Sequence, residues 1–247
     1  MKVIGLISGG KDSIYNLMQC QKNGHEIVML GHLSRPKDKG ELDSYMYQTV
    51  GSEMADAIAE CLGLPLIKRE ISSKPINFEL EYKETKNDEV EDLFLLLQDA
   101  LKLNPEIKGV SSGAIMSTYQ KNRVENLCDR LGLTSIAYLW ERNQKELLKE
   151  MIDNEMNSVI IKTCAYGLGK DDLLKSIKDL YPKLLDLSKQ FDLNICGEGG
   201  EFESLTLDCP LYKKKIEITE FEKVIHSSDA FTEVSYAVIK KWEVKEK

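Results

Sequence analysis

The chain of 247 residues has little of what marks a fibrous, disordered or membrane protein. Only six residues are proline and no segment is of low complexity, so an ordinary globular protein is expected. The longest apolar runs, at 93–97 and 159–161, are far shorter than the roughly 20 residues of a membrane-spanning helix. No basic segment followed by an apolar stretch opens the chain, which predicts a cytoplasmic protein without a secretory signal.

Patterns for binding metals and nucleic acids are also lacking. The six cysteines and three histidines are scattered, with no Cys-x-x-Cys pair, so the sequence supports no zinc ribbon. Cysteines spaced in this way are typical of a reducing compartment. The 33 basic residues are outnumbered by 41 acidic ones, and the net charge of −8 argues against a stable nucleic-acid partner.

The order of the apolar segments predicts an α/β fold. Alternating strands and helices favour a Rossmann-like parallel sheet with helices on both faces. The expected strands are 2–7, 26–30, 65–71, 107–110, 135–139 and 158–163. The expected helices are 13–22, 49–61, one from residue 88, 117–130 and 143–153.

After Pro182 the pattern changes, which predicts a smaller C-terminal α+β subdomain. Strands or strand fragments are expected there at 201–207, 213–218, 223–226 and 232–242. We expect one domain at 1–135 and a second at 136–247. Two helix starts are also predicted from capping-box spacing, by Asp88 with Glu91 and by Ser117 with Gln120.

The loop after the first strand holds the most informative pattern, Ser-Gly-Gly-Lys-Asp-Ser at 8–13. Its glycines let a polyphosphate approach the backbone, and the N–H groups at the helix start attract anions. Lys11 adds a positive charge. The segment fits a P-loop from Gly5 to Lys11, but Asp12 stands where that loop needs a hydroxyl for magnesium. The P-loop interpretation therefore fails at its last position.

The same six residues resemble the PP-loop of the N-type ATP pyrophosphatases. Three further segments resemble the diphthine–ammonia ligase (diphthamide synthetase) family of that superfamily, in its order and spacing. They are Leu-Asp-Ser-Tyr-Met-Tyr-Gln-Thr at 42–49, Gly-Val-Ser-Ser-Gly-Ala-Ile at 109–115 and Cys-Gly-Glu-Gly-Gly-Glu-Phe-Glu-Ser at 196–204. The likeness extends from residue 1 to about residue 216.

The resemblance implies a HUP-type fold and an AMP-forming ligase. The carboxylate of diphthine, a modified histidine of translation elongation factor 2, would be adenylated by ATP with Mg²⁺, releasing pyrophosphate. Ammonium, the expected nitrogen source, would then displace AMP and yield diphthamide. In this interpretation residues 1–135 bind ATP and residues 136–247 bind the protein substrate. No membrane partner is expected, and the oligomeric state is open, a homodimer being one option.

Two other functions stay open. A PP-loop enzyme that modifies tRNA by thiolation is the first, although it usually needs paired cysteines and a basic surface. The second is an ATP-binding protein without catalysis, which would bind ATP tightly without turnover.

The nucleotide is expected at the switch point of a 3-2-1-4-5 sheet, beside the loops that follow the first and fourth strands. Lys11 would neutralise the departing pyrophosphate. Asp12 would bind magnesium or cap the helix, and Gly31 with His32 would line adenine or simply end a strand. The predicted nucleotide-binding residues are Ser8, Gly9, Gly10, Lys11, Asp12, Ser13, Gly31, His32, Ser112 and Gly113.

Acidic residues around a Gly-Gly pair are candidates for the chemistry. Glu198, Glu201 and Asp208 would hold the trimethylammonium group of diphthine, bind magnesium or deprotonate ammonium; a hairpin turn with exposed acids is the alternative. Glu198 and Glu201 are the predicted catalytic acids, together with Lys11 and Asp12. Asp208 is assigned to substrate binding.

Three aromatic residues and one arginine complete the predicted substrate site. Tyr45 and Tyr47 would form an aromatic wall for a quaternary ammonium, or pack in the core. Tyr119 and Arg123 share one helix face. Arg123 would meet phosphate or carboxylate, or form a surface ion pair.

Overall fold

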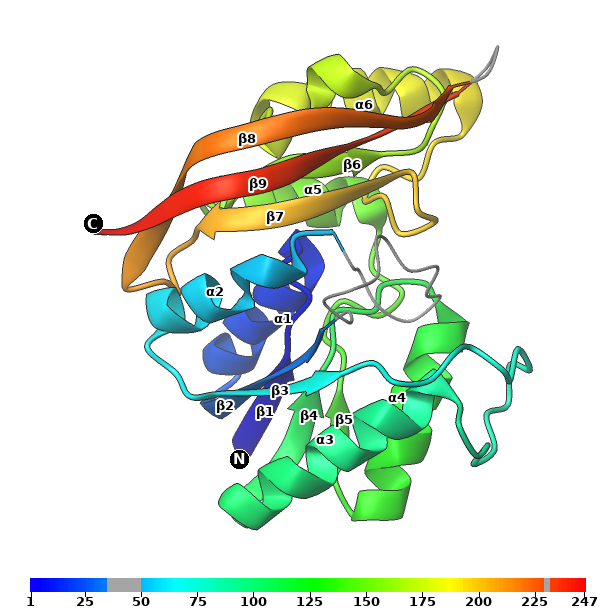
Figure 1. The fold of residues 1–247 in the computed structure, drawn as a ribbon, viewed down its shortest axis with the longest axis vertical. Coiled ribbons are helices and arrows are strands. Elements are labelled where there is room, and N and C mark those ends of the chain that lie inside the picture. Colours follow the sequence, from blue (N-terminus) through cyan, green and yellow to red (C-terminus); the bar gives the residue numbers. More distant parts are fainter. Residues whose placement is uncertain (35–49, 229–231) are drawn as a thin grey trace. The chain divides into compact units, whose positions relative to one another are not determined.

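The computed structural model describes residues 1–34, 50–228 and 232–247 of the chain. Two compact units can be distinguished (Figure 1). The first contains Met1–Ser8, Asp12–Ala59 and Leu64–Trp140, and the second contains Gly9–Lys11, Glu60–Gly63 and Glu141–Lys247. The division at 135 and 136, with its two binding roles, stays a prediction.

A five-stranded parallel sheet forms the centre of the first unit, in the order β3-β2-β1-β4-β5 (Figure 1). This order confirms the predicted 3-2-1-4-5 arrangement and the Rossmann-like fold. The strands are β1 (Lys2–Leu6), β2 (Glu26–Ser34), β3 (Leu66–Glu70), β4 (Ile107–Ser111) and β5 (Thr134–Ile136). The helices are α1 (Lys11–Lys22), η1 (Ser52–Met54), α2 (Ala55–Leu62), α3 (Glu89–Leu103) and α4 (Thr118–Leu131).

Both faces of this sheet are covered. Successive residues of a strand point to opposite faces. Ile4 accordingly packs into a large cluster with residues of α3 and α4, whereas Val3 packs with Cys20 of α1 and with Ile136. The apolar residues Val90, Leu93 and Leu97 of α3 are buried in this cluster.

Both predicted helix starts have their N-cap. The Asp88 carboxylate accepts a hydrogen bond from the Val90 N–H at 3.0 Å, and the Ser117 hydroxyl accepts one from the Gln120 N–H at 3.3 Å. A capping box would also have the Glu91 carboxylate accept from the backbone N–H of Asp88. This part of the prediction is wrong, because that carboxylate accepts from the Tyr82 hydroxyl and from Arg130 instead.

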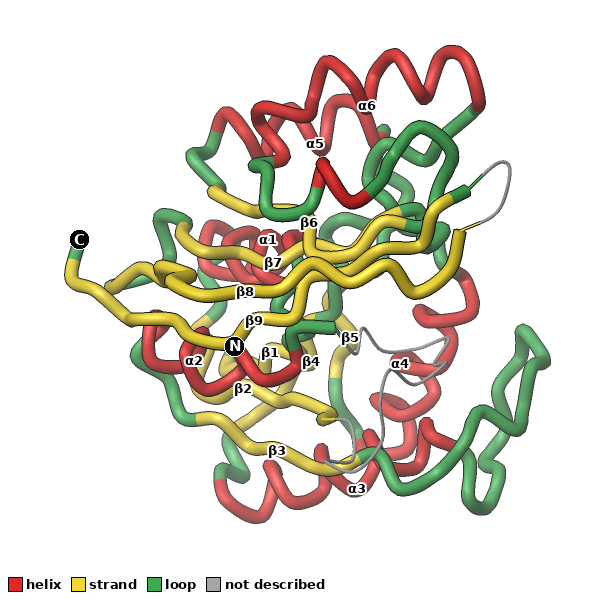
Figure 2. Tube along the Cα trace, turned by 45° about the horizontal axis from the view of Figure 1, so that its top comes forward, coloured by secondary structure: helices red, strands yellow, loops and turns green. Residues whose placement is uncertain are grey.

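The second unit is built on an antiparallel sheet in the order β7-β6-β9-β8. Figure 2 shows the long strands β8 and β9 in yellow. This confirms the smaller C-terminal α+β subdomain. Its strands are β6 (Asn157–Thr163), β7 (Phe202–Asp208), β8 (Lys214–Ser228) and β9 (Glu233–Glu246). Its helices are α5 (Gln144–Asp153), η2 (Lys170–Asp172) and α6 (Ile177–Phe191).

Three expectations for this unit are corrected. The strand expected at 158–163 is β6, which pairs antiparallel with β7 and β9 instead of extending the parallel sheet. The fragments at 213–218 and 223–226 are one strand, β8, because register shifts near Glu220 let its pairing with β9 continue through the break in alternation. No helix was expected at Ile177–Phe191, where Pro182 lies inside α6. The helix forms because the Ser176 hydroxyl caps its start and its apolar residues, such as Leu184, are buried.

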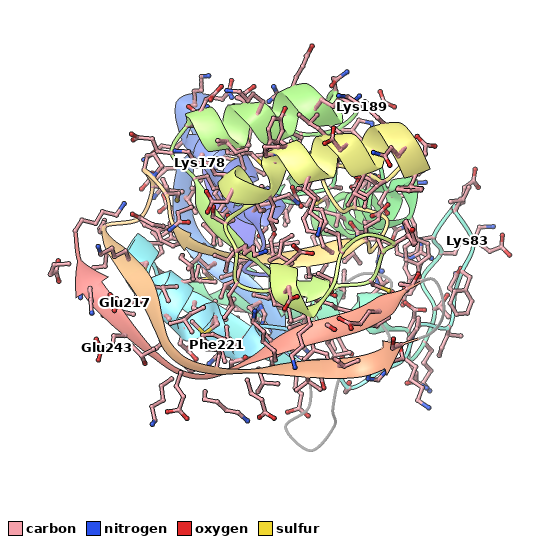
Figure 3. All side chains as sticks on the ribbon, turned by 90° about the horizontal axis from the view of Figure 1, so that it is seen from above. Lys83, Lys178, Lys189, Glu217, Phe221 and Glu243 are labelled. Carbon is pink, nitrogen blue, oxygen red and sulfur yellow. The ribbon has the colours of Figure 1, made fainter. Side chains whose placement is uncertain are left out.

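The long β8–β9 ribbon carries a ladder of charges. Glu217 lies opposite Glu243, and both point outward from the ribbon (Figure 3). Lys245 pairs with both carboxylates, at 2.8 and 3.3 Å, and so offsets the repulsion between them. Within the described residues, no helix has the length and apolarity needed to cross a membrane.

Candidate active site

The strand–loop–helix corner at residues 8–13 begins in the first unit. Helix α1 starts at Lys11, two residues earlier than predicted, so Asp12 and Ser13 lie in its first turn. Asp12 is therefore not the N-cap, although its charge is favourable at the positive end of the helix dipole. The Ser8 N–H donates a hydrogen bond to the Ser13 hydroxyl at 3.4 Å.

The loop after β4 packs directly on this corner. A Cβ atom added to Gly113 would lie 2.6 Å from the Ser13 nitrogen and 2.7 Å from the Asp12 carbonyl carbon. Backbone atoms cannot give way to such a contact, so only glycine fits. The loops after β1 and β4 thus lie side by side at the carboxyl edge of the sheet, as the order of the strands requires. Beside Gly113, Ser112 is buried and its N–H donates to Ile136.

Asn16, which the sequence analysis missed, joins three elements at this edge. Its side-chain amide donates to the Ser111 hydroxyl at 2.7 Å and to the Ile136 carbonyl at 2.9 Å. Its carbonyl oxygen accepts from the Tyr138 N–H at 2.8 Å. The side chain is fully buried. Asn16 could have been identified from the sequence, because it is a polar residue on the apolar side of an amphipathic helix. A polar side chain buried at such a position needs hydrogen-bond partners within the protein.

His32 supports the loop from the other side of β1. Its Nδ1–H donates to the Ile7 carbonyl and its Nε2 accepts from the Ser52 hydroxyl, both at 2.8 Å. Burial lowers the pKa of His32, and the bond to Ile7 opposes that shift. Both ring nitrogens are engaged, so the histidine holds the residue that precedes Ser8. The neighbouring Gly31 carbonyl accepts from the Ile7 N–H at 2.9 Å, and a contact of either residue with adenine stays a prediction.

The central loop residues Gly9–Lys11 belong to the second unit. The Gly9 carbonyl accepts from the Thr206 N–H at 2.9 Å, and the Lys11 N–H donates to the Ser204 hydroxyl at 3.1 Å. The Lys11 ammonium donates to the Cys196 carbonyl and lies 5.2 Å from the centre of the Phe202 ring. At 3% exposure, Lys11 is a buried side chain rather than a solvated surface lysine.

The predicted acidic turn, 196–201, lies in the same unit. Its conformation needs glycine at position 197, where φ is +73° and a Cβ would meet the Phe202 carbonyl at 2.8 Å. Asn194 organises the turn, because its Oδ1 accepts from the Cys196 N–H at 3.1 Å and lies 3.4 Å from the Glu198 N–H. The signal was present in the sequence, since asparagine before a glycine-rich stretch is typical of a turn.

Glu201 is the better placed of the two predicted catalytic glutamates. Its Oε1 accepts from the Asn194 N–H at 3.2 Å. Its Oε2 is buried and has no hydrogen-bond partner among the described residues. A buried oxygen of this kind is costly unless a proton or a cation satisfies it.

The structure does not bring Asp208 together with these acids. Glu201 directly precedes β7 and Asp208 ends it, so the two carboxylates are separated by roughly 20 Å of extended strand. Asp208 pairs with Lys247 at 2.6 Å. Tyr45 and Tyr47 lie outside the described residues.

Arg123 is held by the protein itself. Its guanidinium is fully buried, lies 3.2 Å from the centre of the Tyr119 ring and donates to the carbonyls of Tyr119, Asn77 and Glu79. The alternative of a surface ion pair is therefore wrong. The Tyr119 hydroxyl also binds the Asn77 carbonyl, at 3.3 Å, and burial raises its pKa. A contact of either residue with substrate stays a prediction.

The cysteines do not resemble a thiolation site. All six are free and only Cys164 is exposed. Burial raises the pKa of Cys61 and Cys209 to about 11 and that of Cys128 to about 12. These three groups are protonated thiols at neutral pH, whereas sulfur chemistry needs a thiolate.

Comparison with known proteins finds relatives along nearly the whole chain. Residues 1–135 match the family model of the diphthamide synthase N-terminal domain, and residues 143–240 match that of the diphthamide synthase C-terminal domain. The chain is 50% identical over 252 residues to the diphthine–ammonia ligase of Mus musculus, covering 100% of this chain and 94% of the relative. It is 51% identical over 241 residues to that of Homo sapiens, covering 96% and 90%.

A relative from Schizosaccharomyces pombe, also named diphthine–ammonia ligase, is 50% identical over 240 residues. The match covers 97% of this chain but 39% of that longer protein. Two family models that together cover most of the chain, and full-length relatives with half of their residues identical, show that the chain belongs to the diphthamide synthase family.

Proposed function

We propose that this protein is an AMP-forming ligase that amidates diphthine on translation elongation factor 2 with ammonium and ATP. The observation that carries the proposal is the β1–α1 corner, where the Ser-Gly-Gly-Lys-Asp-Ser loop opens a helix and Gly113 packs against Ser13. Such a corner offers backbone N–H groups and a positive helix end to a polyphosphate. Membership of the diphthamide synthase family supports the choice of substrate.

In the first half-reaction, a carboxylate oxygen of diphthine bonds to the α-phosphorus of ATP and pyrophosphate leaves. Ser8 and Ser13 supply hydroxyl donors for the phosphates, and Lys11 supplies a buried positive charge for the leaving pyrophosphate. Asp12, in the first turn of α1, is the carboxylate assigned to Mg²⁺. Mg²⁺ would neutralise phosphate charge there.

In the second half-reaction, ammonia attacks the acyl carbon and AMP leaves with the electron pair of the broken C–O bond. Ammonium must first lose a proton, which needs a base. Glu201 is assigned this role, because one of its oxygens is buried and accepts no hydrogen bond from the described part of the chain. Glu198 lies in the same turn and is assigned to the cationic part of the substrate. A translation factor as substrate supports a cytoplasmic activity as part of this proposal.

The test is a reconstituted reaction. Purified protein is incubated with diphthine-bearing elongation factor 2, ammonium and ATP labelled at the α-phosphate. We expect AMP, pyrophosphate and conversion of the carboxylate to a primary amide by mass spectrometry, in equal amounts. Formation of ADP, or AMP formation that does not need the modified factor, would refute the proposal.

A Lys11→Met variant sharpens this experiment. It keeps the length and apolar stem of the side chain but removes the charge. We expect the rate to fall about a hundredfold or more, as for loss of one electrostatic stabiliser of a transition state. Lys22→Met, at the other end of the same helix, is the matched control and should leave the rate unchanged.

A further inference from the structure

The segment between β3 and α3 displays apolar side chains outward. Ile76, Phe78 and Leu80, here called the apolar strip, are 49%, 59% and 61% exposed. They occupy alternate positions of an extended stretch without regular secondary structure. The segment runs past α4 and projects from the first unit in both views (Figures 1 and 2), with Lys83 pointing outward (Figure 3).

The backbone that carries the apolar strip is held by buried charged groups. The Asp88 carboxylate accepts from the N–H groups of Ile76 and Asn77, at 2.9 and 2.8 Å. From the opposite side, the Arg123 guanidinium donates to the carbonyls of Asn77 and Glu79, at 2.6 and 3.1 Å. Asp88 and Arg123 are only 1% and 0% exposed. The conformation of the strip is therefore fixed by the molecule itself.

This arrangement is unusual for a segment that serves only stability. A loop normally turns its apolar side chains inward, because their burial is the main favourable term in folding. Here buried charges, which are costly to desolvate, hold the main chain while the apolar side chains point to solvent. A rigid apolar surface loses little conformational entropy on association, and exposed apolar patches mark binding sites.

Acidic side chains lie within the strip. Glu79 and Glu81 alternate with its apolar residues and are exposed, and neither carboxylate forms an ion pair in the described part of the chain. Glu84, farther along, is paired with Arg130. Charge complementarity therefore selects a partner whose apolar side chains are flanked by lysine or arginine.

The position of the strip connects it to the site. It follows β3 at the carboxyl edge of the sheet, the edge where Gly113 packs on Ser13. The Tyr119 hydroxyl, in the first turn of α4, donates to the Asn77 carbonyl and joins the strip to the helix that follows the Gly113 loop. ATP is assigned to the β1–α1 corner and ammonium has no apolar group to bury, so a protein substrate is the reactant that fits an apolar surface.

From these observations we infer that Ile76, Phe78 and Leu80, with Glu79 and Glu81, form the docking surface for the protein substrate of the ligase. The surface binds an apolar patch with basic neighbours on the protein that carries the diphthine carboxylate. This inference rests on the proposed function for the identity of its partner.

The test compares the double variant I76K/L80K with the control variant L103K. Leu103 is the last residue of α3, is 69% exposed and lies at the other end of that helix, so the same exchange is made outside the strip. Dissociation constants for diphthine-bearing elongation factor 2 and KM values for this factor and for ATP are measured for each protein. We expect I76K/L80K to raise the dissociation constant and the KM for the factor about tenfold and to leave the KM for ATP unchanged. In L103K we expect none of these values to change.

Failure of this inference differs from failure of the proposed function. If the wild-type protein amidates the factor but I76K/L80K binds and uses it like wild type, the docking surface is refuted and the ligase stands. If the wild-type protein binds the factor without amidating it and the double variant loses binding, the ligase is refuted and the surface stands.

The variant E79K/E81K should weaken binding most at low salt, because complementary charges are screened as ionic strength rises. An equal loss of binding in L103K would also overturn the docking surface.

Discussion

The side-chain amide of Asn16 donates a hydrogen bond to the Ser111 hydroxyl, and this 2.7 Å contact fixes helix α1 to the end of β4. The same amide donates to the Ile136 carbonyl at the end of β5. Because α1 and the loop after β4 both flank the predicted nucleotide site, Asn16 is a positioning residue for that site.

Asn16→Asp keeps the shape of the side chain but places an acceptor against the Ile136 carbonyl. We expect the KM for ATP to rise about tenfold, since a displaced loop weakens nucleotide binding by more than about 1 kcal/mol. Steady-state kinetics on folded protein measure this change. A purely structural defect would instead lower the amount of active enzyme and leave the KM for ATP unaltered. Ser111→Ala removes one of the three hydrogen bonds of the Asn16 side chain. Its KM for ATP should lie between the values of the wild type and of Asn16→Asp.

Gly113→Ala should abolish ATP binding while the protein stays folded. The added methyl group would meet backbone atoms of Ser13 and Asp12 within 2.7 Å, so the loop must move away from α1. Gly24→Ala is the control, because that glycine has φ of +76° but open space around its Cβ position. It should cost about 1 kcal/mol of stability and leave ATP affinity unchanged. Isothermal titration with ATP and urea unfolding distinguish the two effects.

Asp88→Ala should destabilise the protein more than Ser117→Ala does. Asp88 caps α3 and also accepts from the Ile76 and Asn77 N–H groups, whereas the Ser117 hydroxyl accepts from the Gln120 N–H as the cap of α4. We expect a loss of about 2–4 kcal/mol for Asp88 against about 1 kcal/mol for Ser117. Urea denaturation measures both values, and limited proteolysis should cut the Asp88 variant first between residues 72 and 88. Equal losses in the two variants would contradict this account.

His32 should make the protein less stable as the pH falls below about 6.5. Burial lowers the pKa of His32 in the folded state, so the unfolded chain binds a proton at a pH where the folded protein does not. Stability then decreases with falling pH, by at most about 1.4 kcal/mol per pH unit, until the folded pKa is reached. The free energy of unfolding of the wild type and of His32→Gln is measured at several pH values between about 5 and about 8. The variant should lose this part of the slope; identical slopes would contradict the assignment.

Glu201→Gln should reduce amidation strongly, and Asp208→Asn should not. The two residues stand at opposite ends of β7, and Asp208 is paired with Lys247. We expect a loss of roughly a hundredfold or more for Glu201, as for removal of a general base, and less than about threefold for Asp208. The rate of amide formation at saturating ammonium gives both values. Activity in the Glu201 variant that recovers at higher pH, where ammonium has already lost its proton to give ammonia, would support the role of Glu201 as the base.

Local patterns in the sequence determined much of this protein. The alternation of apolar segments predicted a parallel sheet with helices on both faces, and Asp88 and Ser117 were found as helix caps because a cap is set by neighbouring residues. The Ser-Gly-Gly-Lys-Asp-Ser loop was likewise visible, since the turn and its N–H groups depend on six consecutive residues.

Only the tertiary structure decided what depends on residues distant in the chain. Arg123 could be placed on a helix face, but packing decided that its guanidinium is buried against Tyr119 and the carbonyls of residues 77 and 79. Asp208 is near Glu201 in sequence, yet the extended geometry of β7 separates them. Asn16 gained its role only from Ser111 and Ile136, at separations of 95 and 120 residues. Periodicity reports which face of an element is apolar, whereas the partners of a buried polar group are chosen by the packing of the whole chain.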